Sequence, residues 1–145
     1  MSVEGGSWWT LGADVAMGPG GTDRCFGGVC QKGGLTWAGG SGLWLRSGVA
    51  TYGAGLIAAF VLVILAAALA AKRSGRLAAG SAAVACVTAL APAATFVATR
   101  PALGPAPIGY GLWLFGAGVA LGLVAARLVL AGKPAPAPAS PKEEP

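Results

Sequence analysis

Three long apolar stretches without a charged side chain dominate the pattern of hydrophobic and polar positions. They cover residues 47–71, 77–99 and 101–126. Each is longer than the about 20 residues that an α-helix needs to cross the roughly 30 Å hydrocarbon core of a bilayer. A water-soluble domain has no reason to build such segments in succession. The pattern predicts an all-α membrane protein with three transmembrane helices, at about residues 47–71, 77–99 and 108–131.

The remaining segments differ from the spans in composition. Residues 1–46 alternate glycine-rich turns with short β-prone runs, among them 7–11 and 35–37, and predict an extracytoplasmic hairpin or small sheet. Residues 132–145 form a Pro/Ala-rich run that ends in mixed charge, which predicts an extended, disordered cytoplasmic tail. The transmembrane domain between them, residues 47–131, leaves no room for a soluble catalytic domain.

The basic residues favour an N-terminus outside and a C-terminus in the cytoplasm, because cytoplasmic loops retain Lys and Arg during insertion. The cytoplasmic side then holds the larger basic set, Lys72, Arg73, Arg76, Arg127, Lys133 and Lys142, while the outer side holds Arg24, Lys32, Arg46 and Arg100. All tryptophans and tyrosines share that outer side. Residues 1–46 contain no signal peptide, so one interpretation is that the natural gene begins further upstream and encodes a fourth span.

A disulfide-stapled hairpin is predicted over residues 24–31. Two adjacent glycines lie between β-formers there, and both central residues of a type I′ turn need positive φ. Phe26 and Val29 then flank the turn, and Cys25 pairs with Cys30 within reach of a disulfide. A structural staple is the favoured role, since neither a basic cluster nor a Cys-x-x-Cys spacing is present to lower a thiol pKa. Two cysteines without a histidine cannot complete a zinc site.

Aromatic side chains near the span ends predict an outer belt at the level of the lipid headgroups, where amphipathic rings are enriched. Its members are Trp44, Tyr52, Tyr110 and Trp113. Pro92 in the second span removes a backbone donor and predicts a helix kink. Thr88, one turn earlier, is expected to satisfy a freed carbonyl.

Small residues recur within the spans at a spacing that lets helix backbones approach closely. The predicted packing pairs are Gly118 with Gly122, Gly116 with Ala120, and Gly55 with Ala59. A coding bias toward glycine and alanine is the alternative explanation. If packing is the reason, these faces predict a homo-oligomer or a larger membrane complex.

Several function classes are disfavoured. The chain contains no histidine, which excludes imidazole haem ligation, His-based acid–base catalysis and His-rich metal sites. No charged residue lies deep inside a predicted span, where pumps, carriers and charge-selective pores need one. The net charge of +5 is spread singly or at span ends, unlike a nucleic-acid surface. We expect no enzymatic activity, no cofactor, no metal, no nucleic acid and no small-molecule substrate; the lipid bilayer is the expected partner.

The arrangement resembles the claudin and peripheral-myelin-protein superfamily of four-span proteins. The residues that carry the resemblance are Trp8, Trp9, the pair Cys25 and Cys30, and the run Gly42-Leu43-Trp44. In that family the Gly-Leu-Trp element precedes both cysteines, whereas here it follows them, and the family's first span has no counterpart. The resemblance implies a small adhesion, barrier or accessory protein whose outer sheet contacts neighbours.

The leading hypothesis is a non-enzymatic integral membrane protein of structural, adhesion or accessory-subunit type, in a bacterial inner membrane. Its helix faces and outer sheet would make the contacts. A membrane thiol–disulfide oxidoreductase that uses Cys25 and Cys30, with Cys86 as a membrane-side partner, is the alternative. A pore or transporter component is a further possibility.

Overall fold

The computed structural model describes residues 6–71, 75–102 and 104–132. The strands are β1 (Trp9–Leu11), β2 (Val15–Gly18), β3 (Gly21–Phe26) and β4 (Val29–Gly33), followed by the 3₁₀ helix η1 (Leu35–Ala38). Three α-helices follow: α1 (Gly42–Ala70), α2 (Arg76–Ala98) and α3 (Tyr110–Ala131). The predicted tail at 133–145 lies outside the described residues.

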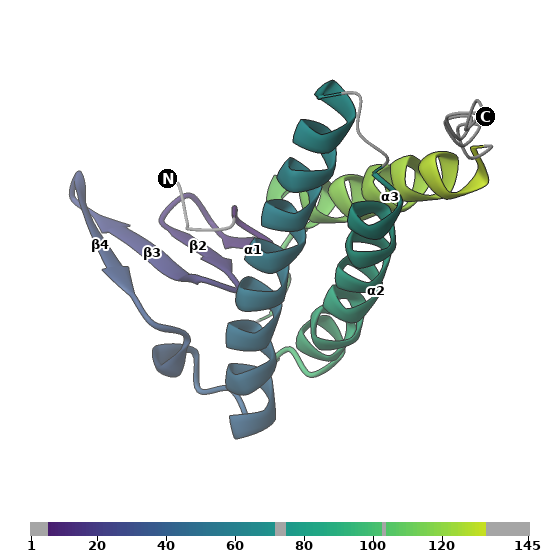
Figure 1. Ribbon diagram of the computed structural model, residues 1–145. Coiled ribbons are helices and arrows are strands. Elements are labelled where there is room, and N and C mark those ends of the chain that lie inside the picture. The colour runs from purple at the N-terminus through teal and green to yellow at the C-terminus, as the bar shows by residue number, and fades with distance from the viewer. Residues whose placement is uncertain (1–5, 72–74, 103, 133–145) are drawn as a thin grey trace, which may run out of the picture.

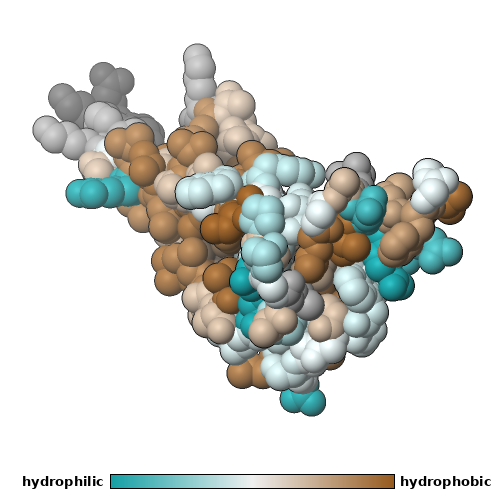
Figure 2. Space-filling view, turned by 180° about the vertical axis from the view of Figure 1, so that it is seen from behind, coloured by the Kyte–Doolittle hydropathy of each residue, from teal (hydrophilic) through white to brown (hydrophobic). Residues whose placement is uncertain are grey.

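Within the described chain, three helices are long and apolar enough to cross a membrane, which confirms that part of the prediction. Their outward surfaces remain apolar: Phe60, Val63, Leu121 and Leu128 are all at least 66% exposed. Figure 2 shows hydrophobic side chains gathered over the helices at the upper left, and more hydrophilic ones at the right, over the sheet. Such a surface suits lipid as the solvent of the helices.

Helix α1 begins earlier than predicted, at Gly42 instead of residue 47. The side chain of Ser41 accepts a hydrogen bond from the backbone N–H of Trp44 at 3.2 Å and caps the helix. Since α1 has 29 residues, its length is about 43 Å, well beyond the hydrocarbon core. Its first turns lie beside the sheet, where Trp44, Ser47 and Thr51 are buried.

The four strands form an antiparallel meander in the order β1-β2-β3-β4. The hairpin over residues 24–31 is confirmed: Phe26 pairs with Val29, Cys25 pairs with Cys30, and both turn glycines have positive φ. The prediction of a strand at residues 35–37 is wrong, because those residues form the 3₁₀ helix η1. Gly39 caps the C-terminus of η1 with φ 68°, a left-handed conformation that suits glycine. It ends η1 and lets the chain change direction between β4 and α1.

The sheet is joined to the helices by backbone pairing at its β1 edge. The N–H of Gly109 donates to the carbonyl of Trp8 at 2.7 Å, and the N–H of Gly111 donates to that of Ser7 at 2.8 Å. A methyl group on Gly111 would lie 2.7 Å from the carbonyl carbon of Gly6, so only glycine permits this approach. The start of α3 is thereby fixed against the strand. We call the end of the bundle where α1 and α3 begin and α2 ends the sheet end.

Buried small residues along α2 allow the helices to pack. They recur at helical spacing and end in one aromatic ring: Ala79, Ala82, Cys86, Ala89, Ala93 and Phe96. Figure 1 shows α1 and α2 running side by side while α3 crosses them. At the end opposite the sheet, the Arg76 side chain donates to the carbonyl of Gly132 and ties α2 to the end of α3.

Candidate functional site

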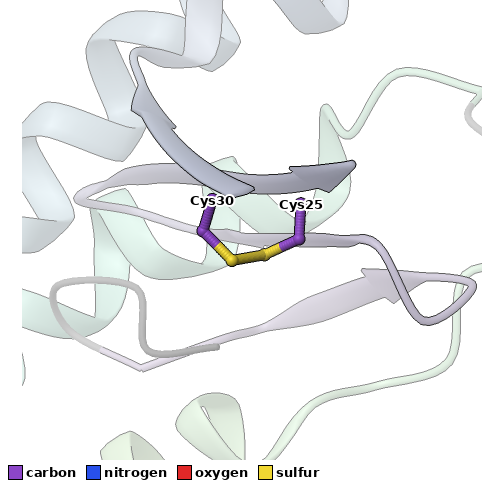
Figure 3. The surroundings of a disulfide bond; sticks show 2 residues. All are labelled: Cys25 and Cys30. Atoms are coloured by element: carbon purple, nitrogen blue, oxygen red, sulfur yellow. A yellow bond between two sulfur atoms is a disulfide. The ribbon is translucent and has the colours of Figure 1, made fainter. Parts of the chain in front are cut away.

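The tip of the β3–β4 hairpin is an exposed apolar element held by a disulfide. Phe26 and Val29 face each other across the turn and are 69% and 66% exposed. The adjacent Cys25 and Cys30 are disulfide-bonded, with their Cα atoms 4.0 Å apart, and Figure 3 shows the bridge between the paired strands. Because side chains alternate along a strand, the apolar pair and the disulfide occupy opposite faces of the hairpin. The tip projects away from the helices (Figure 1).

An aromatic cluster connects the sheet to the helices. The Phe96 ring of α2 is its centre: it stacks on Trp44 at 5.1 Å between ring centroids and lies 5.6 Å from Trp8 and 5.2 Å from Trp9. Phe115 of α3 reaches Trp8 at 5.3 Å. Rings from the sheet and from all three helices therefore pack together, and aromatic contacts of this kind stabilise beyond their buried area.

Sequence reasoning missed Phe96 and Phe115 as members of this cluster. Both rings lie inside stretches that were interpreted only as transmembrane, where a single aromatic residue carries no positional signal. In the structure Gly48 lies against Phe96, because a methyl group on it would be 2.9 Å from that ring, but nothing in the sequence links the two positions. The second strand was also missed, although Val15 to Met17 precede the two-residue turn formed by Pro19 and Gly20.

The predicted aromatic belt is divided in the structure. Tyr110 and Trp113 are 52% and 71% exposed on α3, and Tyr52 is half-buried on α1. Trp44 does not join them, which corrects its assignment to the belt. It is completely buried against Phe96, and a ring without exposed surface contacts no headgroup.

The predicted packing glycines face different surroundings. Gly122 is buried in α3, where an added methyl group would lie 2.9 Å from the sulfur of Cys86 and 3.1 Å from the methyl carbons of Leu62. Gly116 and Gly118 are exposed, and an added methyl group at either would meet nothing within 4 Å. Gly55 has Phe115 as its nearest neighbour, at 3.8 Å. Of the four, Gly122 is the one that brings helices together within the chain.

Pro92 and Cys86 both lie in α2. The helix continues on either side of Pro92, and the kink there stays a prediction. The hydroxyl of Thr88 donates to the carbonyls of Val84 and Ala85, at 3.0 and 3.1 Å, and not to a carbonyl freed by the proline. Cys86 is buried between the helices with Ala58 and Val119, on a different element from the disulfide.

Among the described residues, no cluster of three or more His, Cys, Asp or Glu side chains could hold a metal ion. The polar contacts near the hairpin are structural in kind. Trp37 donates through Nε1 to the hydroxyl of Thr22 at 2.7 Å, and the Arg24 guanidinium lies 4.7 Å from the centre of the Trp37 ring. No protein-family model, curated protein or solved structure matches the chain.

Proposed function

We propose that this chain is a non-enzymatic integral membrane protein of adhesion, structural or accessory-subunit type, whose hairpin tip binds a partner protein. The supporting observation is the pair of exposed apolar side chains, Phe26 and Val29, on a hairpin closed by a disulfide. Apolar rings and aliphatic groups held rigidly on a surface are typical of interaction sites, because little conformational entropy is lost when they bind.

The attachment of the sheet supports the same proposal. Ordering a flexible segment on binding costs free energy and weakens affinity. The sheet already packs on the helices through Trp8, Trp9 and Phe96, so binding at its hairpin would not carry this cost. The partner is another membrane protein or a second copy of the chain. We propose that the sheet lies outside the cell membrane of a bacterium, with the C-terminal tail in the cytoplasm.

Co-purification in a mild detergent tests the proposal. The wild-type chain should elute as a complex larger than its own 14.1 kDa, as measured by light scattering after size exclusion. The double substitution Phe26→Ser/Val29→Ser should release the partner, because it removes the apolar tip without removing the disulfide. The matched control, Ala13→Ser/Asp14→Ser, changes the exposed β1–β2 turn of the same sheet and should keep the complex. A wild-type protein that is a clean monomer would refute the proposal.

One observation favours a second candidate function, thiol–disulfide exchange: the pair lies near the exposed hairpin tip, where Cys30 is open to solvent. Exchange enzymes need an accessible and easily reduced disulfide. The described structure places Cys86 inside the bundle, so a route from this thiol to the pair would require a rearrangement.

A further inference from the structure

A polar pocket lies on the β3–β4 hairpin, at the end away from the exposed tip. Its volume is about 290 Å³, and it is lined by Thr22, Asp23, Lys32 and the glycines at 20, 21, 33 and 34. Asp23 and Lys32 are paired residues of the two strands and therefore lie opposite each other. A pocket of this size suits a ligand of a few heavy atoms, since it lies at the lower limit of small-molecule sites.

The pocket forms where glycines adjoin this charged pair. Because side chains alternate along a strand, Asp23 and Lys32 share one face of the hairpin with Gly21. Thr22 belongs to the other face, where its hydroxyl accepts a hydrogen bond from an indole N–H. Gly34 lies two residues beyond Lys32 and keeps an extended backbone. The two glycines carry no side chain, so they leave a hollow next to the charged pair.

Asp23 is the unusual member of this lining. It is only 6% exposed, and no described residue donates a hydrogen bond to its carboxylate. Buried carboxylates are almost always paired, because removing their charge from water costs free energy that a partner must offset. Asp23 contributes to the wall of the pocket, so a donor that enters the pocket can reach it. The missing partner is therefore a positively charged donor on a ligand.

We propose that the pocket binds a small zwitterion, whose ammonium group donates to the Asp23 carboxylate and whose acid group accepts from the Lys32 ammonium. A lysine ammonium carries three N–H donors, so it can serve a ligand as well as a contact within the chain. Free α-amino acids and the phosphoethanolamine head group of lipids both have this chemistry. The inference depends neither on a partner at the hairpin tip nor on the orientation in the membrane.

A simple cation fits the pocket less well than a zwitterion. Lys32 would repel a metal ion or a guanidinium group bound at Asp23, because like charges at close range raise the free energy of the complex. A calcium ion also takes about six to eight oxygen ligands, whereas Asp23 supplies the one carboxylate of the described lining. A ligand that carries both charges compensates both side chains.

Titration of the isotope-labelled full chain in a mild detergent tests the site, with the amide resonances of Gly21, Gly33 and Gly34 as the readout. The zwitterionic probes are L-alanine and glycerophosphoethanolamine, and at least one should shift these resonances. The tighter binder identifies the source as a free amino acid or a lipid head group. Binding of neither probe would overturn the proposal.

Two further probes test whether both charges are needed. N-acetyl-L-alanine lacks the ammonium group, and L-alanine amide lacks the carboxylate. If L-alanine is the tighter zwitterion, each should bind at least about tenfold more weakly than L-alanine, as expected for one lost charged hydrogen bond. If glycerophosphoethanolamine is the tighter one, glycerophosphate and ethanolamine take their places. Equal binding of a singly charged probe would overturn the zwitterion as the ligand.

Asp23→Asn separates a ligand-binding carboxylate from a structural one. It should weaken the binding of the tighter zwitterion at least about tenfold. The same substitution at an exposed carboxylate of the β1–β2 turn, Asp14→Asn, should bind as the wild type does. Without ligand, Asp23→Asn should unfold at the wild-type temperature or above it, because it removes a buried charge. Unchanged binding would overturn the site, as would a lowered unfolding temperature, which would assign Asp23 to an ion pair within the chain.

Discussion

At the scale of single residues, burial separates side chains that look alike in the sequence. Gly116, Gly118 and Gly122 all belong to small-residue pairs, yet only Gly122 is enclosed. Spacing shows that glycines share a helix face, but it does not show which face meets a neighbour. Trp44 illustrates the same limit, because a tryptophan near a span end suits a headgroup belt as well as it suits a core.

The structure therefore predicts a large effect at Gly122. Gly122→Val should destabilise the helical bundle by about 1–3 kcal/mol, because its first added carbon would already lie 2.9 Å from the sulfur of the buried Cys86 and 3.1 Å from the methyl carbons of Leu62, so these side chains would have to shift. Thermal unfolding in detergent, followed by circular dichroism, measures the effect.

Gly80 provides the matched control for this experiment. It also lies in a helix, but an added methyl group there meets nothing within 4 Å. Gly80→Val should change the free energy of unfolding by less than about 0.5 kcal/mol. If the two variants unfolded at the same temperature, the close packing of α2 and α3 at Gly122 would be refuted.

At the scale of elements, a sequence pattern predicted the right structure where it restricts the backbone conformation strongly. The two turn glycines predicted the β3–β4 hairpin and its register, since few residues other than glycine occupy two successive positive φ values. The run 35–37 has β-forming residues as well, but its glycine neighbours end β4 and reverse the chain. Its conformation depends on tertiary contacts, in which Leu35 is buried in the aromatic cluster and Trp37 donates to Thr22.

The disulfide should stabilise the hairpin tip locally. A disulfide across a sequence separation of 5 lowers the conformational entropy of the unfolded segment, which stabilises the folded hairpin by about 2 kcal/mol. The tip lies outside the aromatic cluster, so this stabilisation should stay local. Cys25→Ser/Cys30→Ser should therefore speed amide hydrogen exchange of residues 26–29 and leave the unfolding temperature of the helices unchanged.

Graded reduction followed by alkylation distinguishes the staple from the exchange enzyme. A structural bridge should resist reductants in the glutathione range, whereas a catalytic pair should open in them. Cys86 serves as the internal reference, because its buried thiol should react with the alkylating reagent only after unfolding. Facile reduction of the native pair would favour the oxidoreductase over the staple.

At the scale of the whole molecule, the sequence predicted the number of helices but not how the sheet is held. Residues 107–111 pair with β1 through backbone hydrogen bonds that leave no sequence signal except glycines at 109 and 111. The aromatic cluster also requires that rings from α1, α2 and α3 meet at one point, and no local sequence pattern predicts this contact between distant segments. This attachment gives the molecule two chemically distinct ends, with the sheet at one and Arg76 and Arg127 near the other.

The two ends lead to a prediction about orientation. Cytoplasmic flanks retain Lys and Arg, and the sequence has six of them on the side of Arg76 and Arg127 against four on the side of the sheet, so the end that carries Arg76 and Arg127 should face inward. The Cys25–Cys30 bridge then lies in the oxidising compartment that disulfides require. Reporter cysteines at two exposed sites, Ala13→Cys in the sheet and Gly132→Cys beyond α3, read out the orientation with a membrane-impermeant thiol reagent. In intact bacterial cells the first should be labelled, while the second should react only after the membrane is opened. The reverse pattern would invert the topology, and protein that stays dissolved without detergent would remove the membrane from the interpretation altogether.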